Sequence, residues 1–223
     1  MNISRKLPIG IQSFEKLRRD EYLYIDKTPF IWKLVQSSNP YFLSRPRRFG
    51  KSLFLSTLAA YFRGQKELFK DLYLEKAEEE QAVLENRAAW QEYPVLYLDF
   101  NSGIYTDEAA LISSIEYFFK QYEELYAIEP LDSIPKRFEN LLRRVYEKTG
   151  KQVVVLVDEY DKPLLETLQS HAQHGAYKGK LRAFYSVVKG YSQYLRFVFL
   201  TGVTRFAKVG IFSGLNNLKD LSI

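Results

Sequence analysis

The chain contains no cysteine, and its 223 residues include a single methionine and two histidines. Without cysteine the protein has neither a disulfide nor a cysteine-ligated metal, which fits a reducing compartment. The N-terminus lacks an apolar core of signal-peptide length, and no run approaches the roughly 18 apolar residues of a membrane span. We therefore expect a cytoplasmic protein with no membrane partner.

The net charge of the chain is also small. Lysine and arginine number 32 against 27 acidic residues, for a net charge of +5. This mild excess permits a nucleic-acid partner without requiring one. Hydrophobic residues make up 46% and aromatic residues 16% of the chain, enough to bury a sizeable core and to argue against disorder.

Four short segments are rich in β-branched and aromatic residues, and the last three are almost continuously apolar; they are residues 40–44, 93–100, 152–160 and 196–203. This pattern predicts strands buried on both faces, as in a parallel sheet. Segments with helical spacing lie between them, at 51–64, 74–93, 108–128, 134–150 and 180–195. The polar stretch 169–180 is expected to be a loop. Strands alternating with helices predict an α/β fold with a mostly parallel central sheet flanked by helices.

The segment "SRPRRFGKSL" (44–53) ends in the last three letters of a phosphate-binding loop, Gly50-Lys51-Ser52. The predicted strand before it and the predicted helix after it are the setting that such a loop requires. Lys51 would reach the β and γ phosphates, and the Ser52 hydroxyl would ligate Mg²⁺. On the tripeptide alone, a chance GKS beside basic residues is an equally good interpretation.

The first position of this loop normally holds glycine, but here it holds Arg45. Arginine must adopt a different conformation there, and the proline that follows fixes the next φ. The candidate nucleotide-contacting residues of the loop are Arg45, Pro46, Arg47, Arg48, Phe49, Gly50, Lys51, Ser52 and Leu53.

Two carboxylates follow the third predicted strand, in "VVVLVDEYDK". Asp158 would hold the Mg²⁺ shell, and Glu159 would polarise the attacking water. The bland alternative is a strand that ends in solvated acids. The GKS loop upstream makes that alternative much weaker, and the two motifs together predict a nucleoside-triphosphate site.

In sheets with such a Glu beside the Asp, a further strand lies between the loop strand and the acidic strand. The segment 196–200 fits that place, followed by Thr201 as a candidate sensor and Arg205 as a candidate contact of the γ phosphate. A hydroxyl that only satisfies the backbone is an equal alternative for Thr201, and a surface or partner contact is one for Arg205. Asp99 ends another strand, either near the cleft or as a cap. Asp161 either orients water, binds an arginine of another subunit, or caps the helix that begins near Pro163.

Three stretches resemble the bacterial AAA-ATPase-like domain family: "LPIGIQSFEKLRRDEYLYIDKTPFI", "FLSRPRRFGKSLFLSTLAAYF" and "VVVLVDEYDKPL". The segments "YPVLYLDF" and "FLTGVTRFAKVGIFSGLNNLKDLS" are similar to its remaining strands. Arginine commonly replaces the first loop glycine in that family. The resemblance implies a P-loop ATPase domain of the RecA/AAA-like type with an additional strand, at the N-terminus of a longer protein that often continues into a PD-(D/E)XK nuclease-like domain.

By this resemblance, residues 1–223, including the N-terminal segment 1–35, form one ATPase domain that is truncated at its C-terminal end. A nucleic-acid partner would come through the missing nuclease-like domain. The resemblance also places Asp26 near the base and ribose. From the residues alone, an equal alternative is that Asp26 and Lys27 form a structural pair or cap the helix that begins at Thr28-Pro29.

The sequence thus predicts a domain that binds ATP and Mg²⁺ and hydrolyses ATP to ADP and phosphate, and that is a candidate homo-oligomer. Lys51, Glu159, Thr201 and Arg205 are the candidate catalytic residues, and Ser52 and Asp158 the metal ligands. The alternative is a nucleotide-sensing switch or nucleic-acid-binding module with little hydrolysis. His171 and His174 could bind metal, but two histidines in a solvated loop make the better interpretation.

Overall fold

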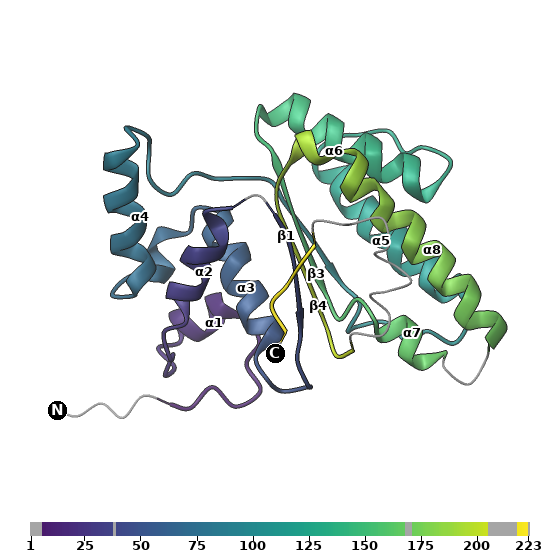
Figure 1. Cartoon of the computed structure of the whole chain (residues 1–223), viewed down its shortest axis with the longest axis horizontal. Helices are drawn as coiled ribbons and strands as arrows, with labels where there is room; N and C mark the ends of the chain where they lie inside the picture. Colours follow the sequence, from purple (N-terminus) through teal and green to yellow (C-terminus); the bar gives the residue numbers. More distant parts are fainter. Residues whose placement is uncertain (1–5, 38, 168–170, 205–217, 223) are drawn as a thin grey trace.

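Five strands form a single sheet in the order β2-β3-β4-β1-β5, and every neighbouring pair is parallel (Figure 1). The computed structural model describes residues 6–37, 39–167, 171–204 and 218–222, without the side chains of 171–173. The strands are β1 (Pro40–Ser44), β2 (Val95–Asp99), β3 (Val153–Asp158), β4 (Leu195–Gly202) and β5 (Lys219–Asp220). The predicted α/β fold of the P-loop type is confirmed, including the strand β4 that lies between β1 and β3.

Helices cover both faces of this sheet. They are α1 (Phe14–Arg19), α2 (Thr28–Val35), α3 (Lys51–Phe62), α4 (Tyr73–Leu84), α5 (Glu108–Leu125), α6 (Ile134–Thr149), α7 (Lys162–Glu166) and α8 (His171–Gly190). Short 3-10 turns cover Lys66–Phe69 and Ser192–Tyr194. In Figure 1, α1 to α4 lie on one side of the sheet and α5, α6 and α8 on the other, giving three layers. None of the helices in the described part of the chain combines the length and apolar character that a membrane crossing needs.

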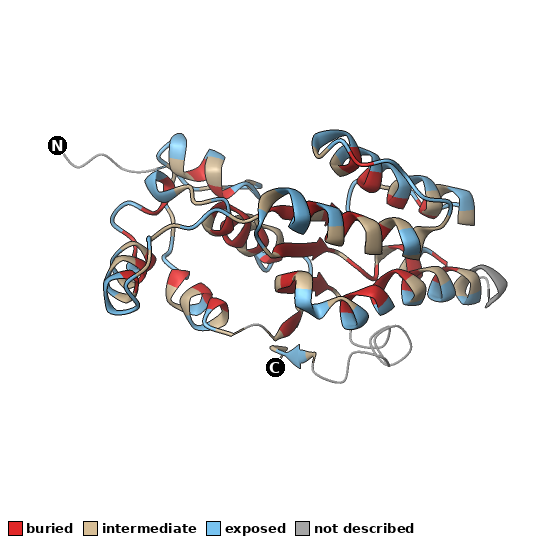
Figure 2. Ribbon diagram, turned by 90° about the horizontal axis from the view of Figure 1, so that it is seen from above, coloured by how far each residue is buried: buried red, intermediate tan, exposed pale blue. Residues whose placement is uncertain are grey.

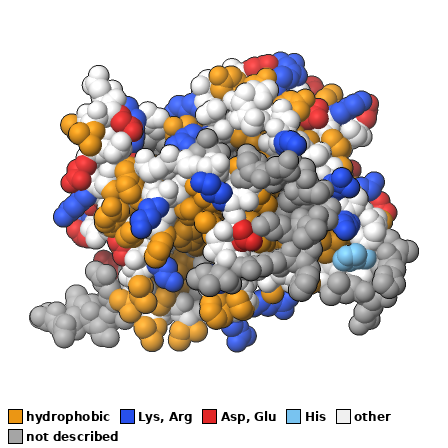
Figure 3. All heavy atoms as spheres, viewed as in Figure 1, with side chains coloured by type: hydrophobic (Ala, Val, Ile, Leu, Met, Phe, Trp, Pro, Cys, Tyr) orange, Lys and Arg blue, Asp and Glu red, His pale blue; other side chains and the backbone are white. Residues whose placement is uncertain are grey.

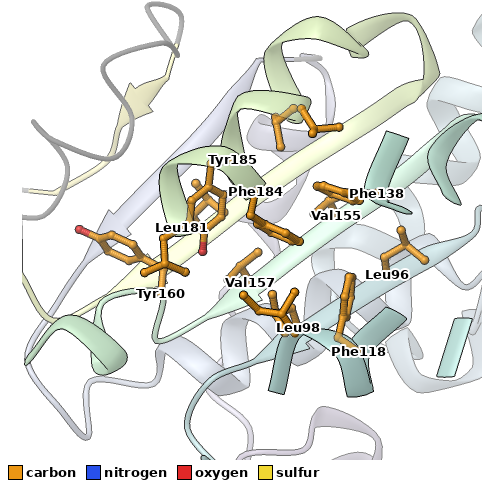
Figure 4. Packing of buried hydrophobic residues seen from close by; sticks show 14 of the residues in the cluster. Leu96, Leu98, Phe118, Phe138, Val155, Val157, Tyr160, Leu181, Phe184 and Tyr185 are labelled. Carbon is orange, nitrogen blue, oxygen red and sulfur yellow. The ribbon is translucent and has the colours of Figure 1, made fainter. Parts of the chain in front are cut away.

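Alternate residues of the buried strands supply two separate cores. On β3, Val155 and Val157 pack on the side of α5, α6 and α8, where Phe138 and Phe184 stack with ring centroids 4.5 Å apart (Figure 4). Leu156 packs instead into the cluster beneath α1, α2 and α3. Figure 2 shows the buried residues concentrated in the strands and on the inward faces of the helices. Because both faces are covered, the strands read as continuous apolar runs rather than as alternating ones.

Helix boundaries differ most from the predictions in the segments 74–93 and 169–195. The helix predicted over 74–93 ends at Leu84. The loop predicted over 169–180 is wrong, because α8 is already helical from His171, and the helix predicted to run to residue 195 ends at Gly190. The buried side chains of Tyr177, Leu181 and Phe184 repeat at helical spacing, and their packing outweighs the low helix propensity of the glycines in this segment. His171 and His174 therefore lie in a helix, and no group of three or more potential ligands capable of holding a metal occurs in the described part of the chain.

Candidate nucleotide-binding site

The carboxyl ends of β1, β3 and β4 meet at one edge of the sheet, since these strands are parallel neighbours. The loop of residues 45–50 leaves β1 at this edge and enters α3, whose first residue is Lys51. Asp158 ends β3, and Thr201 is the residue before the last in β4. The fold thus brings together three segments that are far apart in the sequence.

The loop backbone bends through two left-handed residues. Arg48 has a φ of 69° and Gly50, the N-cap of α3, has a φ of 76°. A Cβ atom on Gly50 would meet nothing within 4 Å, so the requirement for glycine is the positive φ rather than space. Residues that alternate between right- and left-handed conformations turn successive N–H groups into one concavity, which is a recurrent way of binding anions.

Arg45 continues strand β1 instead of making a tight turn. Its backbone N–H donates to the carbonyl oxygen of Gly202 over 3.1 Å, and its φ is not in the left-handed region. Its guanidinium donates to the carbonyl oxygen of Ser44 over 3.2 Å. A residue that bonds to β4 without a left-handed φ has no need of glycine, and this explains how arginine is accommodated at the first position of the loop.

The side chain of Lys51 is almost completely buried, with 4% of the residue exposed. Its ammonium group lies 2.9 Å from Glu159 Oε1 and donates to the carbonyl oxygens of Arg45 (2.9 Å) and Pro46 (3.3 Å). Three oxygen atoms therefore surround one buried cation at the mouth of the loop. The geometry provides a positive charge that is fixed in position and can be shared with an incoming anion.

Glu159 turns out of β3 with a left-handed φ of 52°, which aims its side chain at Lys51. Burial raises the pKa of the Glu159 carboxyl above its ordinary value, and the hydrogen bond and charge of Lys51 offset part of this rise. The backbone N–H of Glu159 donates to Thr201 Oγ1 over 3.3 Å. Lys51 of α3 thus holds the Glu159 carboxylate, and Thr201 of β4 holds its backbone N–H.

Asp158 and Thr201 form a buried pair. The Thr201 hydroxyl donates to Asp158 Oδ1 in a short hydrogen bond, and both residues are at most 2% exposed. Thr201 is therefore more than a hydroxyl that satisfies the backbone, because it joins the acidic residue of β3 to β4. Asp158 and the Ser52 side chain line the same cavity of about 440 Å³. Carboxylate and hydroxyl oxygens beside a phosphate-binding loop are a donor set that fits Mg²⁺, which usually takes one or two carboxylates and completes its shell with phosphate oxygens and water.

A second cavity, of about 250 Å³, opens beside Gly50 and has mostly apolar walls. It is lined by Leu7, Pro8, Leu17, Leu23, Tyr24, Ile25, Lys27, Gly50, Leu53, Phe54 and Thr57. Apolar side chains also remain exposed around its mouth, including Leu7, Ile25 and Phe49. Figure 3 shows hydrophobic side chains gathered along the lower edge of the molecule on the side of the N-terminal helices.

Asp26 does not line either of these cavities. Its Oδ1 accepts hydrogen bonds from the backbone N–H (2.8 Å) and hydroxyl (2.6 Å) of Thr28, and its Oδ2 accepts from the backbone N–H of Tyr73 over 2.8 Å. One carboxylate thus satisfies donors at the starts of both α2 and α4. This geometry matches the capping alternative, whereas its neighbours Tyr24, Ile25 and Lys27 line the apolar cavity.

The remaining candidate residues lie on the phosphate loop, outside the described residues, or just before α7. Pro46, Arg47, Arg48 and Phe49 are exposed on the loop. Arg205 lies outside the described residues. Asp161 precedes α7 but makes no side-chain cap there. It accepts instead from the backbone N–H groups of Val203 and Thr204, at 3.0 and 2.6 Å, so that it fastens the segment after β4 to the end of β3. This role has no signal in the local sequence, because it depends on a contact between two distant segments.

Comparisons with known proteins place the chain in a family. A family model described as "Predicted AAA-ATPase" matches residues 8–212. Over 222 residues the chain is 42% identical to an "Uncharacterized protein in vnfD 5'region" from Azotobacter chroococcum mcd 1. That match covers 98% of this chain and 41% of the relative, so the chain spans less than half the length of this relative. No solved structure matches the chain.

Proposed function

The chain belongs to the predicted AAA-ATPase family, and we propose that it binds ATP with Mg²⁺ and hydrolyses it to ADP and phosphate. The observation that carries this proposal is the convergence of Lys51, Glu159 and the Asp158–Thr201 pair at one end of the sheet. A phosphate-binding lysine, a metal-binding aspartate and a candidate base thereby lie around one loop.

The phosphates bind to the loop of residues 45–50 and the N-terminus of α3. Backbone N–H groups at the start of a helix attract anions, and the left-handed Arg48 and Gly50 shape the loop into a concave surface. Lys51 neutralises the β and γ phosphates. Its present partners are two carbonyl oxygens and one carboxylate, and phosphate oxygens compete with these for the same ammonium group.

Mg²⁺ is held by the Ser52 hydroxyl and by Asp158, with Thr201 fixing the orientation of the aspartate. When bound, the metal neutralises charge that develops on the phosphate oxygens. The adenine base occupies the apolar cavity beside Gly50, where Phe54 and Leu23 offer apolar contact to a planar ring.

Glu159 acts as the general base. A carboxylate whose pKa is raised by burial is a better proton acceptor than an ordinary surface glutamate. In this structure it is paired with Lys51, so binding of the γ phosphate to Lys51 weakens that pair and releases the carboxylate toward water. Arg205 is proposed to contact the γ phosphate in the same state.

We further propose that residues 1–223 are the ATPase domain of a longer protein and that the domain assembles with other copies. The alternative function is a nucleotide-sensing switch, or a nucleic-acid-binding module, with little hydrolysis. Two features favour this alternative. The candidate base Glu159 is engaged in an ion pair with Lys51. Arg47 and Arg48 are exposed on the loop, where they can contact phosphate groups of a nucleic acid.

Binding of a fluorescent ATP analogue, with Mg²⁺ present, tests the proposed function. Wild type is expected to bind, and Lys51→Ala to weaken binding about 10- to 100-fold, since a hydrogen bond to a charged group contributes about 1.5–3 kcal/mol. The matched control is Lys33→Ala, which removes an exposed lysine of α2 and should bind as wild type does. Equal affinities of wild type and Lys51→Ala would contradict the site. Steep loss of DNA or RNA affinity with added salt would favour the nucleic-acid alternative.

A further inference from the structure

We infer that Asp99 is a further positioning residue of this site, which holds water molecules of the metal's hydration shell beside Asp158. The inference rests on the proposed function, because it assigns a role toward the Mg²⁺ of the same nucleotide site. Asp99 ends β2 and belongs to neither the phosphate loop nor the acidic motif of β3.

The register of the sheet places Asp99 next to Asp158. The two residues are paired in the parallel ladder between β2 and β3, and the backbone N–H of Phe100 donates to the carbonyl oxygen of Asp158 over 3.1 Å. In-register residues of neighbouring strands point to the same face of a sheet. That face is the α3 side. Val95 lies four residues before Asp99 and Leu156 lies two residues before Asp158, so each points to the same face as its aspartate, and both pack into the core beneath α3.

A cavity joins Asp99 to the proposed metal ligands. The cavity of about 440 Å³ is lined by Ser52, Asp158 and Asp99 together, and also by Arg63, which follows α3, and Tyr97 of β2. Glu159 is not among the residues that line it, and its side chain is directed at Lys51. The two carboxylates that flank Asp158 in the site, Asp99 and Glu159, therefore approach from different sides.

Each aspartate has one oxygen committed to the protein. Asp99 Oδ1 accepts from the backbone N–H of Asn101 over 2.7 Å, and Asp158 Oδ1 accepts from Thr201. Among the described residues, no hydrogen bond or ion pair uses the second oxygen of either one. Asp158 is only 2% exposed yet lines the cavity with this second oxygen unused by protein, whereas Asp99 is exposed to solvent. Asp158 therefore fits direct coordination of a cation, and Asp99 fits contact with the water around that cation.

Electrostatics supports these two roles, direct coordination by Asp158 and contact with water by Asp99. Two carboxylates on adjacent strands repel each other, and a nearby dication offsets the repulsion. Mg²⁺ gives up its water reluctantly and keeps several water molecules in protein sites. A solvent-exposed carboxylate beside the ligating one can accept hydrogen bonds from those waters, and outer-shell partners of this kind commonly change metal affinity about 10- to 100-fold.

The competing explanation is that Asp99 only caps the turn after β2. Lys162 already fastens that turn, donating to the carbonyl oxygens of Asn101 (2.6 Å) and Gly103 (2.7 Å). Asparagine and serine at position 99 can each accept the Asn101 N–H, as such side chains do in turns. Asp99→Asn and Asp99→Ser therefore keep the cap and remove the charge, and either variant serves if the other folds poorly.

The test is a titration of a fluorescent, non-hydrolysable ATP analogue at increasing Mg²⁺, and again in EDTA, on the whole chain. For Asp99→Asn and Asp99→Ser the Mg²⁺ midpoint should rise about tenfold or more, while affinity in EDTA stays within about twofold of wild type. The control Asp132→Asn removes an exposed aspartate remote from the site and should leave both values unchanged. An unchanged Mg²⁺ midpoint, or an equal loss of affinity in EDTA, would overturn the role of Asp99. If wild type itself fails to bind the analogue with Mg²⁺, the proposed function fails first.

Discussion

The ammonium group of Lys51 lies 2.9 Å from Glu159 Oε1, and this ion pair joins the phosphate loop to the acidic end of β3. Only 3% of the lysine side chain and 13% of the glutamate side chain are exposed. A buried charge without a partner is costly, so each residue needs either the other one or a substitute for it. In the proposed function, a triphosphate would replace Glu159 as the partner of Lys51, and Glu159 would relieve its own unpaired charge by accepting a proton from water.

The hydroxyl of Thr201 should matter for turnover as well as for stability. Thr201→Val keeps the shape of the side chain but leaves Asp158 Oδ1 without its donor, which costs about 1.5–3 kcal/mol for a hydrogen bond to a charged group. We expect a comparable loss in the free energy of unfolding and a fall in kcat of about tenfold. The control Thr167→Val removes a buried hydroxyl that, among the described residues, donates to the carbonyl oxygens of Pro163 and Leu164 in α7; if its kcat fell equally, the role of Thr201 would be general rather than local.

Gly202 ends β4 where the ring of Tyr160 and the carboxylate of Asp161 approach closely. A Cβ atom at this position would lie 2.7 Å from Asp161 Oδ1 and would also overlap the Tyr160 ring. Gly202→Ala should therefore lower the free energy of unfolding by about 1–3 kcal/mol. In Gly179→Ala the new methyl group meets nothing within 4 Å, and the helix should gain about 0.5–1 kcal/mol. Urea denaturation of both variants checks the contrast, and equal stabilities would contradict it.

Asp26 should be a structural residue, not a nucleotide contact. Asp26→Ala removes the acceptor for Thr28 and for the backbone N–H of Tyr73, and loss of such a cap costs about 1 kcal/mol and at most about 2. The melting temperature should fall while the affinity for an ATP analogue stays the same. A large loss of affinity in a well-folded variant would support the ribose contact that the family resemblance implies.

Tyr105 makes the stability of the protein sensitive to alkaline pH. Burial raises the pKa of Tyr105 to about 12, and its hydroxyl donates to the carbonyl oxygen of Phe100 over 3.0 Å. Because the folded-state pKa lies above the ordinary value of about 10, this stabilisation is complete below pH 10 and is lost as the pH rises toward 12. Tyr105→Phe should therefore show a smaller loss of unfolding free energy than wild type between these pH values. Equal losses would show that the hydroxyl does not titrate with unfolding.

The sheet is predictable from the sequence, because parallel strands buried on both faces are apolar runs. Polar residues of the candidate motifs follow directly after these runs. The runs before Ser44, Asp158 and Thr201 predicted the strands, together with the candidate site residues at their ends. The start of α8 is hard to recognise in the sequence, because Gly175 and Gly179 favour a loop, whereas the buried side chains of Tyr177, Leu181 and Phe184 repeat at helical spacing.

The details of the site depend on contacts that no local pattern encodes. The left-handed φ of Arg48, a residue that usually avoids it, follows from the path of the loop between β1 and α3. The Lys51–Glu159 pair and the bonds from Asp161 to the segment after β4 connect residues that are distant in the chain. Asp99 is recognisable in the sequence as a strand-ending acid, but only its register with Asp158 and the shared cavity place it beside the proposed metal ligands.

ATP turnover by wild type beside Glu159→Gln tests the central claim most directly. Glutamine can still accept a hydrogen bond from Lys51 but cannot take a proton from water, and loss of a general base typically slows a reaction by about 100-fold or more. We predict that Glu159→Gln binds a fluorescent ATP analogue within about threefold of wild type, a difference under about 1 kcal/mol, and loses nearly all release of phosphate. Wild-type turnover in the variant, or no turnover in wild type despite tight Mg²⁺-dependent binding, would contradict this account.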